Sequence, residues 1–258
     1  MNNDASIFCL PPNRIVAPWL KSSGNEELLD SCVQYILSPP PHFRACLIEA
    51  SGGAGLTSLL NATKTRLRRE KINAVAIDDG LGGDDPYILT ALLEAMKVPL
   101  PLKSRKCLPA VVERVLQLRR LDCIMVYDVQ RFCYLDRAQK NINLDALRYL
   151  GRLLPDCKFI LGGYPAAVSN FGDAFKADCA RVLTIKPMPY DQTYNDFVRD
   201  VLCLVRAQQL INKLDFKVVH AMSHGFVGIT FSELQYTAIK AANAGDVMSV
   251  EYGSILEL

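Results

Sequence analysis

The chain has 258 residues, of which 50% are hydrophobic and 22% are charged, and its formal net charge is +2. This apolar share excludes a disordered chain, and the length suits one large domain or a medium domain with a small companion. We expect neither a membrane helix, which needs roughly 20 apolar residues, nor a secretory signal. Because the charge is near neutral, any DNA contact has to come from local basic patches.

The nine cysteines are odd in number, and no two of them form a C-x-x-C pair. Several lie inside apolar runs, for example Cys46 and Cys123. We therefore expect reduced, buried thiols in a cytoplasmic protein. His220 and His224 are four residues apart on an expected helix. A zinc site needs further clustered ligands, so we expect no metal.

Strands and helices alternate in the first part of the chain. Periodic apolar residues predict a helix over residues 26–37. Short apolar runs predict strands over residues 45–48, 74–77, 123–127, 158–161 and 182–185. Between them the pattern predicts helices over residues 57–71, 87–96, 109–120 and 144–154. Strands that are apolar on both faces indicate a parallel sheet covered on both sides, which is an open α/β fold.

The pattern changes after Pro187, where no strong strand follows. Helices are predicted over residues 190–214, 216–222 and 228–244. The simplest division is an N-terminal helical segment over residues 1–40, an α/β core over 41–186 and a small helical subdomain over 187–258.

A glycine-rich turn joins the first predicted strand to the next helix, and its residues are Gly52, Gly53, Ala54, Gly55, Leu56, Thr57 and Ser58. The turn parallels the phosphate-binding pattern G-x-x-x-x-G-K-[ST], in which backbone N–H groups and a lysine hold phosphates and a hydroxyl binds magnesium. The last glycine and Thr57 are kept, but Leu56 stands in the lysine position. Losing one charge-assisted hydrogen bond costs about 1.5–3 kcal/mol. The segment is either an ordinary turn or a loop that has kept its shape and lost its main charge.

The third predicted strand ends in Tyr127 and Asp128, followed by Val129. P-loop ATPases carry an aspartate for magnesium here, often followed by a glutamate that polarises water. Asp128 is either the magnesium aspartate, with Val129 in place of the glutamate, or the second carboxylate, with Tyr127 in place of the aspartate. In both alignments one of two carboxylates is missing. A lone aspartate at the end of a strand is the simpler alternative, and we favour a degenerate site.

The order of these segments resembles the AAA+ ATPases that assist DNA transposition, namely TniB, TnsC and, more distantly, MuB. The sequence Y-D-V-Q at 127–130 resembles the family's D-E-x-[HQ], which favours the second alignment. I-L-G-G-Y-P-A-A at 160–167 resembles V-L-V-G-T-P-E-A, A-R-V at 180–182 resembles A-R-F, and G-F-V-G-I at 225–229 resembles the lid motif G-x-[IV]-G-R. The similarity runs from about residue 14 to residue 244 and also includes residues 14–20, 41–44 and 88–101.

This resemblance implies an AAA+ P-loop-type core, a three-layer fold around a parallel sheet, with a C-terminal helical lid. The departures from the family pattern all fall on nucleotide chemistry. The P-loop lysine is Leu56, the magnesium aspartate is Tyr127, the polar sensor residue is Tyr164 and the lid arginine is Ile229. Four losses in one site predict a pseudo-ATPase, with no cofactor beyond weak binding of ATP and magnesium.

Two residues remain as catalytic candidates. Asp128 stands in the position of the family's second carboxylate, and Arg181 stands in the place of an arginine that acts on a neighbouring subunit. A solvated or structural arginine is the alternative for Arg181.

The resemblance also implies duplex DNA as a partner, bound by basic loops of a ring or helical oligomer. The loop at 77–86 instead has four aspartates, which repel phosphate. The next loop is basic, and Lys103, Arg105 and Lys106 are the candidate DNA contacts. Basic residues also gather at helix ends, where solvation is the usual explanation: Lys64, Arg66, Arg68, Arg69, Lys71, Arg119 and Arg120.

Three classes of function follow. The first is a non-hydrolysing regulatory or adaptor subunit in DNA transposition or target selection, with a transposase or target-selection protein as partner. The second is an active ATP-dependent, DNA-binding transposition ATPase. The third is a repurposed protein-interaction module of a mobile-element or defence system. Without ATP at the subunit interface, we expect a monomer or a weak, partner-dependent oligomer, with no membrane contact.

Overall fold

The computed structural model describes residues 23–77, 86–98, 100–102, 104–133, 136–175 and 179–243. Its contacts divide the chain into two compact units. One, here called the α/β unit, comprises Ser23–Gly52 and Leu56–Ile185. The other, here called the helical unit, contains Gly53–Gly55 together with the part of the chain that follows from Lys186, described as far as residue 243.

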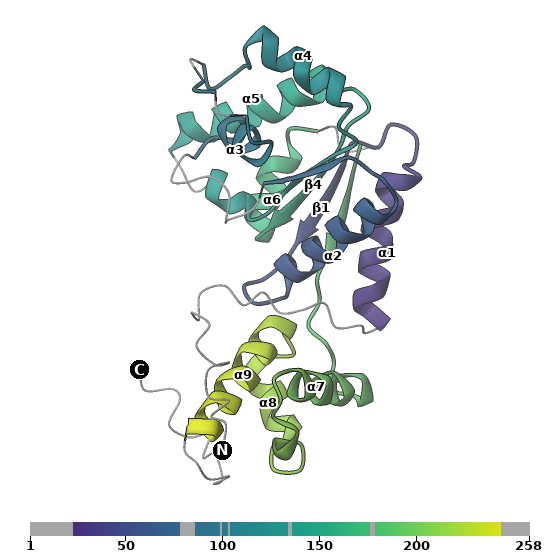
Figure 1. Ribbon diagram of the computed structural model, residues 1–258, viewed down its shortest axis with the longest axis vertical. Helices are drawn as coiled ribbons and strands as arrows, with labels where there is room; N and C mark the ends of the chain where they lie inside the picture. The colour runs from purple at the N-terminus through teal and green to yellow at the C-terminus, as the bar shows by residue number, and fades with distance from the viewer. Residues whose placement is uncertain are drawn as a thin grey trace, which may run out of the picture. The chain divides into compact units, whose positions relative to one another are not determined.

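Five parallel strands form the sheet of the α/β unit, in the order β2-β3-β4-β1-β5 (Figure 1). They are β1 (Ala45–Glu49), β2 (Ala74–Ile77), β3 (Cys123–Val126), β4 (Lys158–Gly163) and β5 (Ala180–Thr184). Since β1, β3 and β4 are buried almost throughout, the sheet is covered on both faces, as apolar parallel strands require. The predicted α/β fold class is confirmed.

The helices lie on both faces of this sheet (Figure 1). Along the sheet, the connection from β1 to β2 runs toward the β2 edge, whereas the later connections run toward the β5 edge. Because connections between parallel strands are right-handed, these two directions place the connecting helices on opposite faces of the sheet. Helices α1 and α2 pack together, whereas α6 packs on β1 and β4 and α3 contacts α5. The helices are α1 (Ser23–Leu37), α2 (Leu56–Arg69), α3 (Ile88–Ala95), α4 (Ala110–Arg119), α5 (Arg137–Leu153) and α6 (Pro165–Gly172), with a short 3₁₀ helix η3 (Val129–Phe132).

Two of these helices differ from the sequence prediction. Helix α5 begins at Arg137 and not at residue 144, because the Asp136 carboxylate accepts a hydrogen bond from the Gln139 N–H at 2.8 Å and caps an additional stretch of helix. Helix α6 is absent from the predicted elements. Pro165 occupies its first turn, where a missing N–H costs no helical hydrogen bond.

A fully buried asparagine ties three segments of the α/β unit together. The Asn143 side chain on α5 accepts a hydrogen bond from the Ile88 N–H at 3.0 Å. It donates to the carbonyl oxygens of Pro86 at 2.8 Å and Phe132 at 3.1 Å. One amide therefore satisfies backbone groups at the start of α3 and at the end of η3, which would be costly to leave unpaired in the core.

Replacing Asn143 by alanine should lower the free energy of unfolding by about 2–4 kcal/mol, because three backbone groups lose their partner, and those of Ile88 and Phe132 are buried. Urea denaturation followed by circular dichroism measures this. Asn141→Ala is the matched control, since Asn141 is an exposed residue of the same helix. Equal midpoints for the two variants would show that the Asn143 network contributes nothing.

The described cysteines are thiols, and most of those in the α/β unit are buried. A hydrogen bond with Cys32, together with burial, raises the pKa of Cys46. Burial raises the pKa of Cys123, and it raises the pKa of Cys157 to about 12. Neutral thiols in apolar surroundings are unreactive, so these cysteines act as small core residues.

The helical unit contains α7 (Gln192–Leu204), α8 (Phe216–Ser223) and α9 (Val227–Asn243), with a 3₁₀ turn η5 (Gln208–Leu210). The prediction of one helix over 190–214 is wrong. Helix α7 ends at Leu204, Arg206 adopts a left-handed φ of 58°, and the Ala207 N–H donates to the Leu202 carbonyl at 2.8 Å. This turn buries Ala207 and Leu210 beneath α7.

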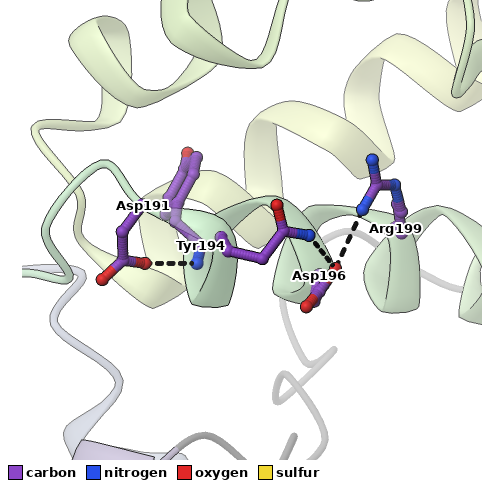
Figure 2. Close-up of polar contacts among 5 residues, drawn as sticks. Asp191, Tyr194, Asp196 and Arg199 are labelled. Atoms are coloured by element: carbon purple, nitrogen blue, oxygen red, sulfur yellow. Dashed lines mark hydrogen bonds and ion pairs between the residues drawn. The ribbon is translucent and has the colours of Figure 1, made fainter.

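Tyr194 is the centre of the helical unit and is fully buried. Its hydroxyl lies 3.3 Å from Ser223 Oγ on α8 and 3.2 Å from Thr230 Oγ1 on α9, so it connects all three helices. The His220 ring packs edge-on against the Tyr194 ring, with the two ring centroids 4.7 Å apart. Figure 2 shows the capping of α7, where the Asp191 carboxylate accepts a hydrogen bond from the Tyr194 N–H at 3.0 Å.

Two properties concern the described part of the chain as a whole. None of its helices is both long and apolar enough to span a bilayer. Within the same residues, no group of three or more histidine, cysteine, aspartate or glutamate side chains could hold a metal ion. His220 Nε2 lies 2.9 Å from the carbonyl oxygen of Met188, which gives it a structural contact.

Candidate functional site

The glycine-rich turn follows β1 at the carboxyl edge of the sheet. The crossover from β1 to β2 passes β4 and β3, whereas the crossover from β4 to β5 passes β1. In open α/β sheets, ligands bind where the crossovers reverse direction, just outside the carboxyl ends of the strands. The predicted loop therefore occupies the position in which this architecture binds phosphate.

Leu56 is the first residue of α2, and its half-buried side chain lies against the sheet. A methyl group placed on Gly162 of β4 would be 2.8 Å from Leu56 Cδ1 and 3.0 Å from Leu60 Cδ1. A side chain at this position would require the ends of these two leucine side chains to shift. The lysine position of the loop thus carries an apolar contact with β4.

Tyr127 follows β3 and is buried on the side of the sheet that faces α2. Its hydroxyl donates to Asn61 Oδ1 at 3.1 Å. Asn61 lies one helical turn after Thr57, the exposed residue in the magnesium-binding hydroxyl position. The side chain of Tyr127 therefore points toward α2, with a neutral phenol beside Asn61, and which of the two alignments applies stays a prediction.

Asp128 adopts a left-handed φ of 50° at the junction of β3 and η3. Its carboxylate accepts a hydrogen bond from Gln130 Nε2, and Gln130 Oε1 accepts one from the Tyr164 N–H at 3.4 Å. A methyl group on Gly163 would lie 2.5 Å from Gln130 Oε1. Gln130 therefore bridges the ends of β3 and β4, and Asp128 belongs to this bridge.

Tyr164 follows β4, and its phenol lies beside the glycine-rich turn. Its side chain is 40% exposed, and a methyl group on Gly52 would be 3.3 Å from Tyr164 Oη. In the same turn Thr57 is exposed and Ser58 is buried. The position expected to hold a polar sensor thus holds an aromatic ring close to the loop backbone.

Gly53 and Gly55 belong to the helical unit and have left-handed φ angles of 73° and 93°. The Gly53 carbonyl accepts hydrogen bonds from the N–H groups of Gly228 at 2.8 Å and Ile229 at 3.2 Å. These are first-turn donors of α9, so the loop carbonyl caps this helix. A methyl group on Gly53 would lie 2.4 Å from Ile229 Cγ1, so the residue in the lid-arginine position packs directly on the turn.

Gly53→Ala should lower the free energy of unfolding by about 2–4 kcal/mol, from left-handed strain and from overlap with Ile229. Thermal or urea unfolding measures the loss. Gly52→Ala is the control, because its added methyl group meets only the end of the Tyr164 side chain, whose nearest atom is Oη at 3.3 Å, and its φ is not left-handed. If Gly53→Ala were as stable as Gly52→Ala, the packing at Gly53 would not constrain the loop.

The other predicted site residues lie away from the turn or outside the described residues. Arg181 is exposed near the amino end of β5, paired with Cys46, whereas the turn is at the carboxyl edge. Its guanidinium donates to the carbonyl of Ala180 at 3.0 Å. The structure does not bring Arg181 to the turn of its own chain, and a role on a neighbouring subunit stays a prediction.

The basic loop that follows α3 is only partly described. Lys103 lies outside the described residues, as do residues 78–85 of the acidic loop. Arg105 is exposed, with its guanidinium 3.9 Å from the centroid of the Tyr87 ring. Lys106 is exposed as well, and its N–H donates to Ser104 Oγ at 3.2 Å. Both side chains are accessible to an anionic partner.

Two residues of the site do not appear among the predicted ones. Asn61 holds the Tyr127 hydroxyl, and Gly162 makes room for Leu56. The spacing of four from Thr57 to Asn61 on a predicted helix could have indicated the first. Nothing in the local sequence distinguishes Gly162 from an ordinary strand glycine, because its role depends on a side chain from another element.

No protein-family model and no curated protein matches the sequence. Solved structures do match it. A Walker-type ATPase of Pyrococcus abyssi has a TM-score of 0.51 and 17% identity, over 86% of this chain and 68% of that one. Cdc6p from Pyrobaculum aerophilum has a TM-score of 0.56 and 16% identity, over 92% of this chain and 66% of that one.

The ORC2 protein of Aeropyrum pernix, solved in ADPNP–ADP complexes, is a third such structure. It has a TM-score of 0.54 and 13% identity, over 93% of this chain and 67% of that one. The chain thus spans about two thirds of the length of these proteins. At these identities the likeness concerns the fold alone, which is the α/β fold of the AAA+ P-loop ATPases.

Proposed function

We propose that the protein is a catalytically degenerate AAA+ protein, a pseudo-ATPase, that acts as a non-hydrolysing regulatory or adaptor subunit in DNA transposition or target selection. The observation that carries this proposal is the contact of Leu56 with β4 at Gly162. In P-loop ATPases a lysine at this position cradles the outer phosphates and stabilises the transferring phosphoryl group. An aliphatic side chain packed on the sheet supplies no charge for either task.

Three further positions support the proposal in the same way. The neutral hydroxyl of Tyr127 is hydrogen-bonded to Asn61. In the second alignment, Tyr127 stands in the position from which a carboxylate would bind magnesium. Tyr164 places its ring beside Gly52, and Ile229 packs on Gly53. The turn keeps its glycines and Thr57, but Leu56 supplies no cation and, in the second alignment, Tyr127 supplies no carboxylate for magnesium. These residues do not fit a tightly bound ATP–magnesium complex, and weak contact with the loop backbone is the most that they support.

The remaining carboxylate does not restore the chemistry. Asp128 is hydrogen-bonded by Gln130, which in turn accepts the Tyr164 N–H. A carboxylate that polarises water acts only on a phosphate that a metal ion and a lysine hold and activate. In the second alignment both of those groups are missing, so Asp128 alone does not support hydrolysis. Asp128 therefore contributes to the connection between β3 and β4.

The role in transposition rests on the resemblance of the motif order to TniB and TnsC. It implies a transposase or a target-selection protein as partner, in the cytoplasm. Duplex DNA is a further proposed partner, through Lys103, Arg105 and Lys106, of which the last two are exposed. The proposed division of the chain remains a segment over 1–40, a core over 41–186 and a lid over 187–258.

Purified protein should bind ATP–magnesium too weakly for calorimetry to resolve a saturable site, and should show no turnover with or without duplex DNA. Leu56→Lys combined with Tyr127→Asp should tighten ATP binding about tenfold or more, because it returns a charge-assisted contact and a metal ligand. Clear turnover by the unmodified protein, abolished in Asp128→Ala, would establish an active ATPase instead.

The adaptor role has a separate test. The immobilised protein should retain the transposase or target-selection protein encoded beside its gene, in the absence of ATP and after nuclease treatment. The same protein with Leu56→Lys should retain the partner equally well, because the contact does not require nucleotide. Failure to retain either partner would favour an interaction module of a different mobile-element or defence system.

A further inference from the structure

Helix α4 carries two apolar stripes, and the core covers only one of them. Val112 and Leu116 are buried in the main core of the α/β unit. Val111, Val115 and Leu118, here called the outer stripe, recur at the spacing i, i+4 and i+7, which aligns them along one side of the helix. The solvent side of a helix is normally polar, so a second apolar stripe there calls for a partner.

The outer stripe is open to water. Leu118 is 69% exposed and Val111 is 64% exposed, and no other large hydrophobic residue in the described part of the chain is as exposed as these two. Val115, between them, is half-buried and lies outside the main core. Covering these side chains with another apolar surface would be favourable.

Arginines lie on both sides of the outer stripe. Arg114 follows Val111 by three residues and Arg119 follows Val115 by four, so helical periodicity places the two arginines on opposite flanks. Arg114 is exposed and makes no hydrogen bond or ion pair with any residue that the structure describes. The stripe is thus an apolar ridge between two cationic side chains.

Contacts with neighbouring segments fix the carboxyl end of α4. Asn73 Nδ2 donates to the carbonyl oxygens of Arg119 at 2.7 Å and Arg120 at 3.4 Å. The Asn73 N–H donates to the Asp122 carboxylate at 2.7 Å. One Arg119 nitrogen donates to the Met96 carbonyl, at the end of α3, at 3.4 Å. The outer stripe is therefore presented in one orientation, without a prior folding step.

The remaining carboxylates of this region do not neutralise the arginines. Glu113 is the acidic residue of α4, and its carboxylate accepts a hydrogen bond from the Tyr149 hydroxyl of α5. On α3, the exposed Glu94 is matched by the exposed Lys97 three residues later. The surroundings of the outer stripe thus favour an anionic partner.

We propose that the outer stripe binds an amphipathic helix of a partner protein, whose apolar residues are flanked by aspartates or glutamates. A helix is the fitting shape, because a ridge of side chains at i, i+4 and i+7 packs into the groove of a second helix. Carboxylates on the two flanks of that helix meet Arg114 and Arg119. The inference rests on the proposed adaptor function, for which it names the docking surface and the chemistry of the partner.

Other occupants match this surface less well. Nucleic-acid phosphates would pair with the arginines and leave Val111 and Leu118 in water. Two copies joined through their outer stripes would bring arginine against arginine, which repel each other. Because a single helix face takes part, the contact is small and its dissociation constant falls in the micromolar range.

Peptide selection on the immobilised full chain tests the chemistry of the partner. The probe is a phage-displayed library of random peptides of about 16 residues, roughly four helical turns, counter-selected against Leu118→Glu. Enriched peptides should carry apolar residues at i, i+4 and i+7 with acidic neighbours. Enrichment of basic peptides, or of none that distinguishes the protein from Leu118→Glu, would overturn the proposal.

Fluorescence anisotropy with one labelled, selected peptide measures the contribution of each residue. Leu118→Ser should weaken binding about tenfold, through lost apolar contact, and Arg114→Glu about fivefold, through repulsion. The same peptide with lysines in place of its acidic residues should bind Arg114→Glu more tightly than it binds the unmodified protein. Binding of either peptide that ignores the charge at residue 114 would contradict the proposed pairing.

Leu204→Ser and Arg206→Glu are the matched controls, because they change an exposed leucine and an exposed arginine of the helical unit. Both should bind the selected peptide like the unmodified protein, and circular dichroism checks that every variant is folded. Sedimentation of the same variants covers the remaining occupant. Self-association that is lost in Leu118→Ser would assign the outer stripe to a second copy and overturn the proposal.

The protein retained in the adaptor test separates this inference from the proposed function. Loss of that protein from Leu118→Ser, with retention by Leu204→Ser, supports both. Equal retention by the two variants would leave the adaptor role standing and overturn the docking surface. Selection of acidic amphipathic peptides, without retention of a transposase or target-selection protein, would support the surface and contradict the role in transposition.

Discussion

The contact of Leu56 with the end of β4 is the constraint on which the functional interpretation depends. Gly162 leaves room for Leu56 and Leu60 on one face of the strand, and Gly163 leaves room for Gln130 and Val129 on the other. Side chains of the same chain thus pack against both faces of β4 at its carboxyl end. Under the proposed function, this packing is the reason why the turn holds no tightly bound nucleotide.

The glycine-rich turn has a structural role of its own. Gly53 has a left-handed backbone, and its carbonyl caps α9 by accepting two first-turn N–H groups. Such a turn remains necessary for the fold whether or not it binds phosphate, because a side chain at Gly53 would overlap Ile229. Preservation of the glycines is therefore compatible with loss of the lysine. Under the proposed function, this explains how the loop can keep its shape while neighbouring residues differ from the P-loop pattern.

Much of the α/β unit could be predicted from sequence, because its strands are short apolar runs that need burial on both faces. Errors arose where the deciding contact is not local. The predicted helix over 190–214 contains no proline or glycine, yet it ends at Leu204, because burial of Ala207 and Leu210 requires a turn at Arg206. Helix α6 was missed because it is short and its apolar pattern resembles a loop after β4.

The sequence by itself determined the order of strand, turn and helix, and the identity of the residues that differ from the P-loop pattern, among them Leu56 and Tyr127. Those features depend on local pattern and on chemical type. The tertiary structure decided which groups these residues meet: Asn61 for Tyr127, across 66 residues, and Gly162 for Leu56. Contacts between distant segments follow from packing, which no local spacing specifies.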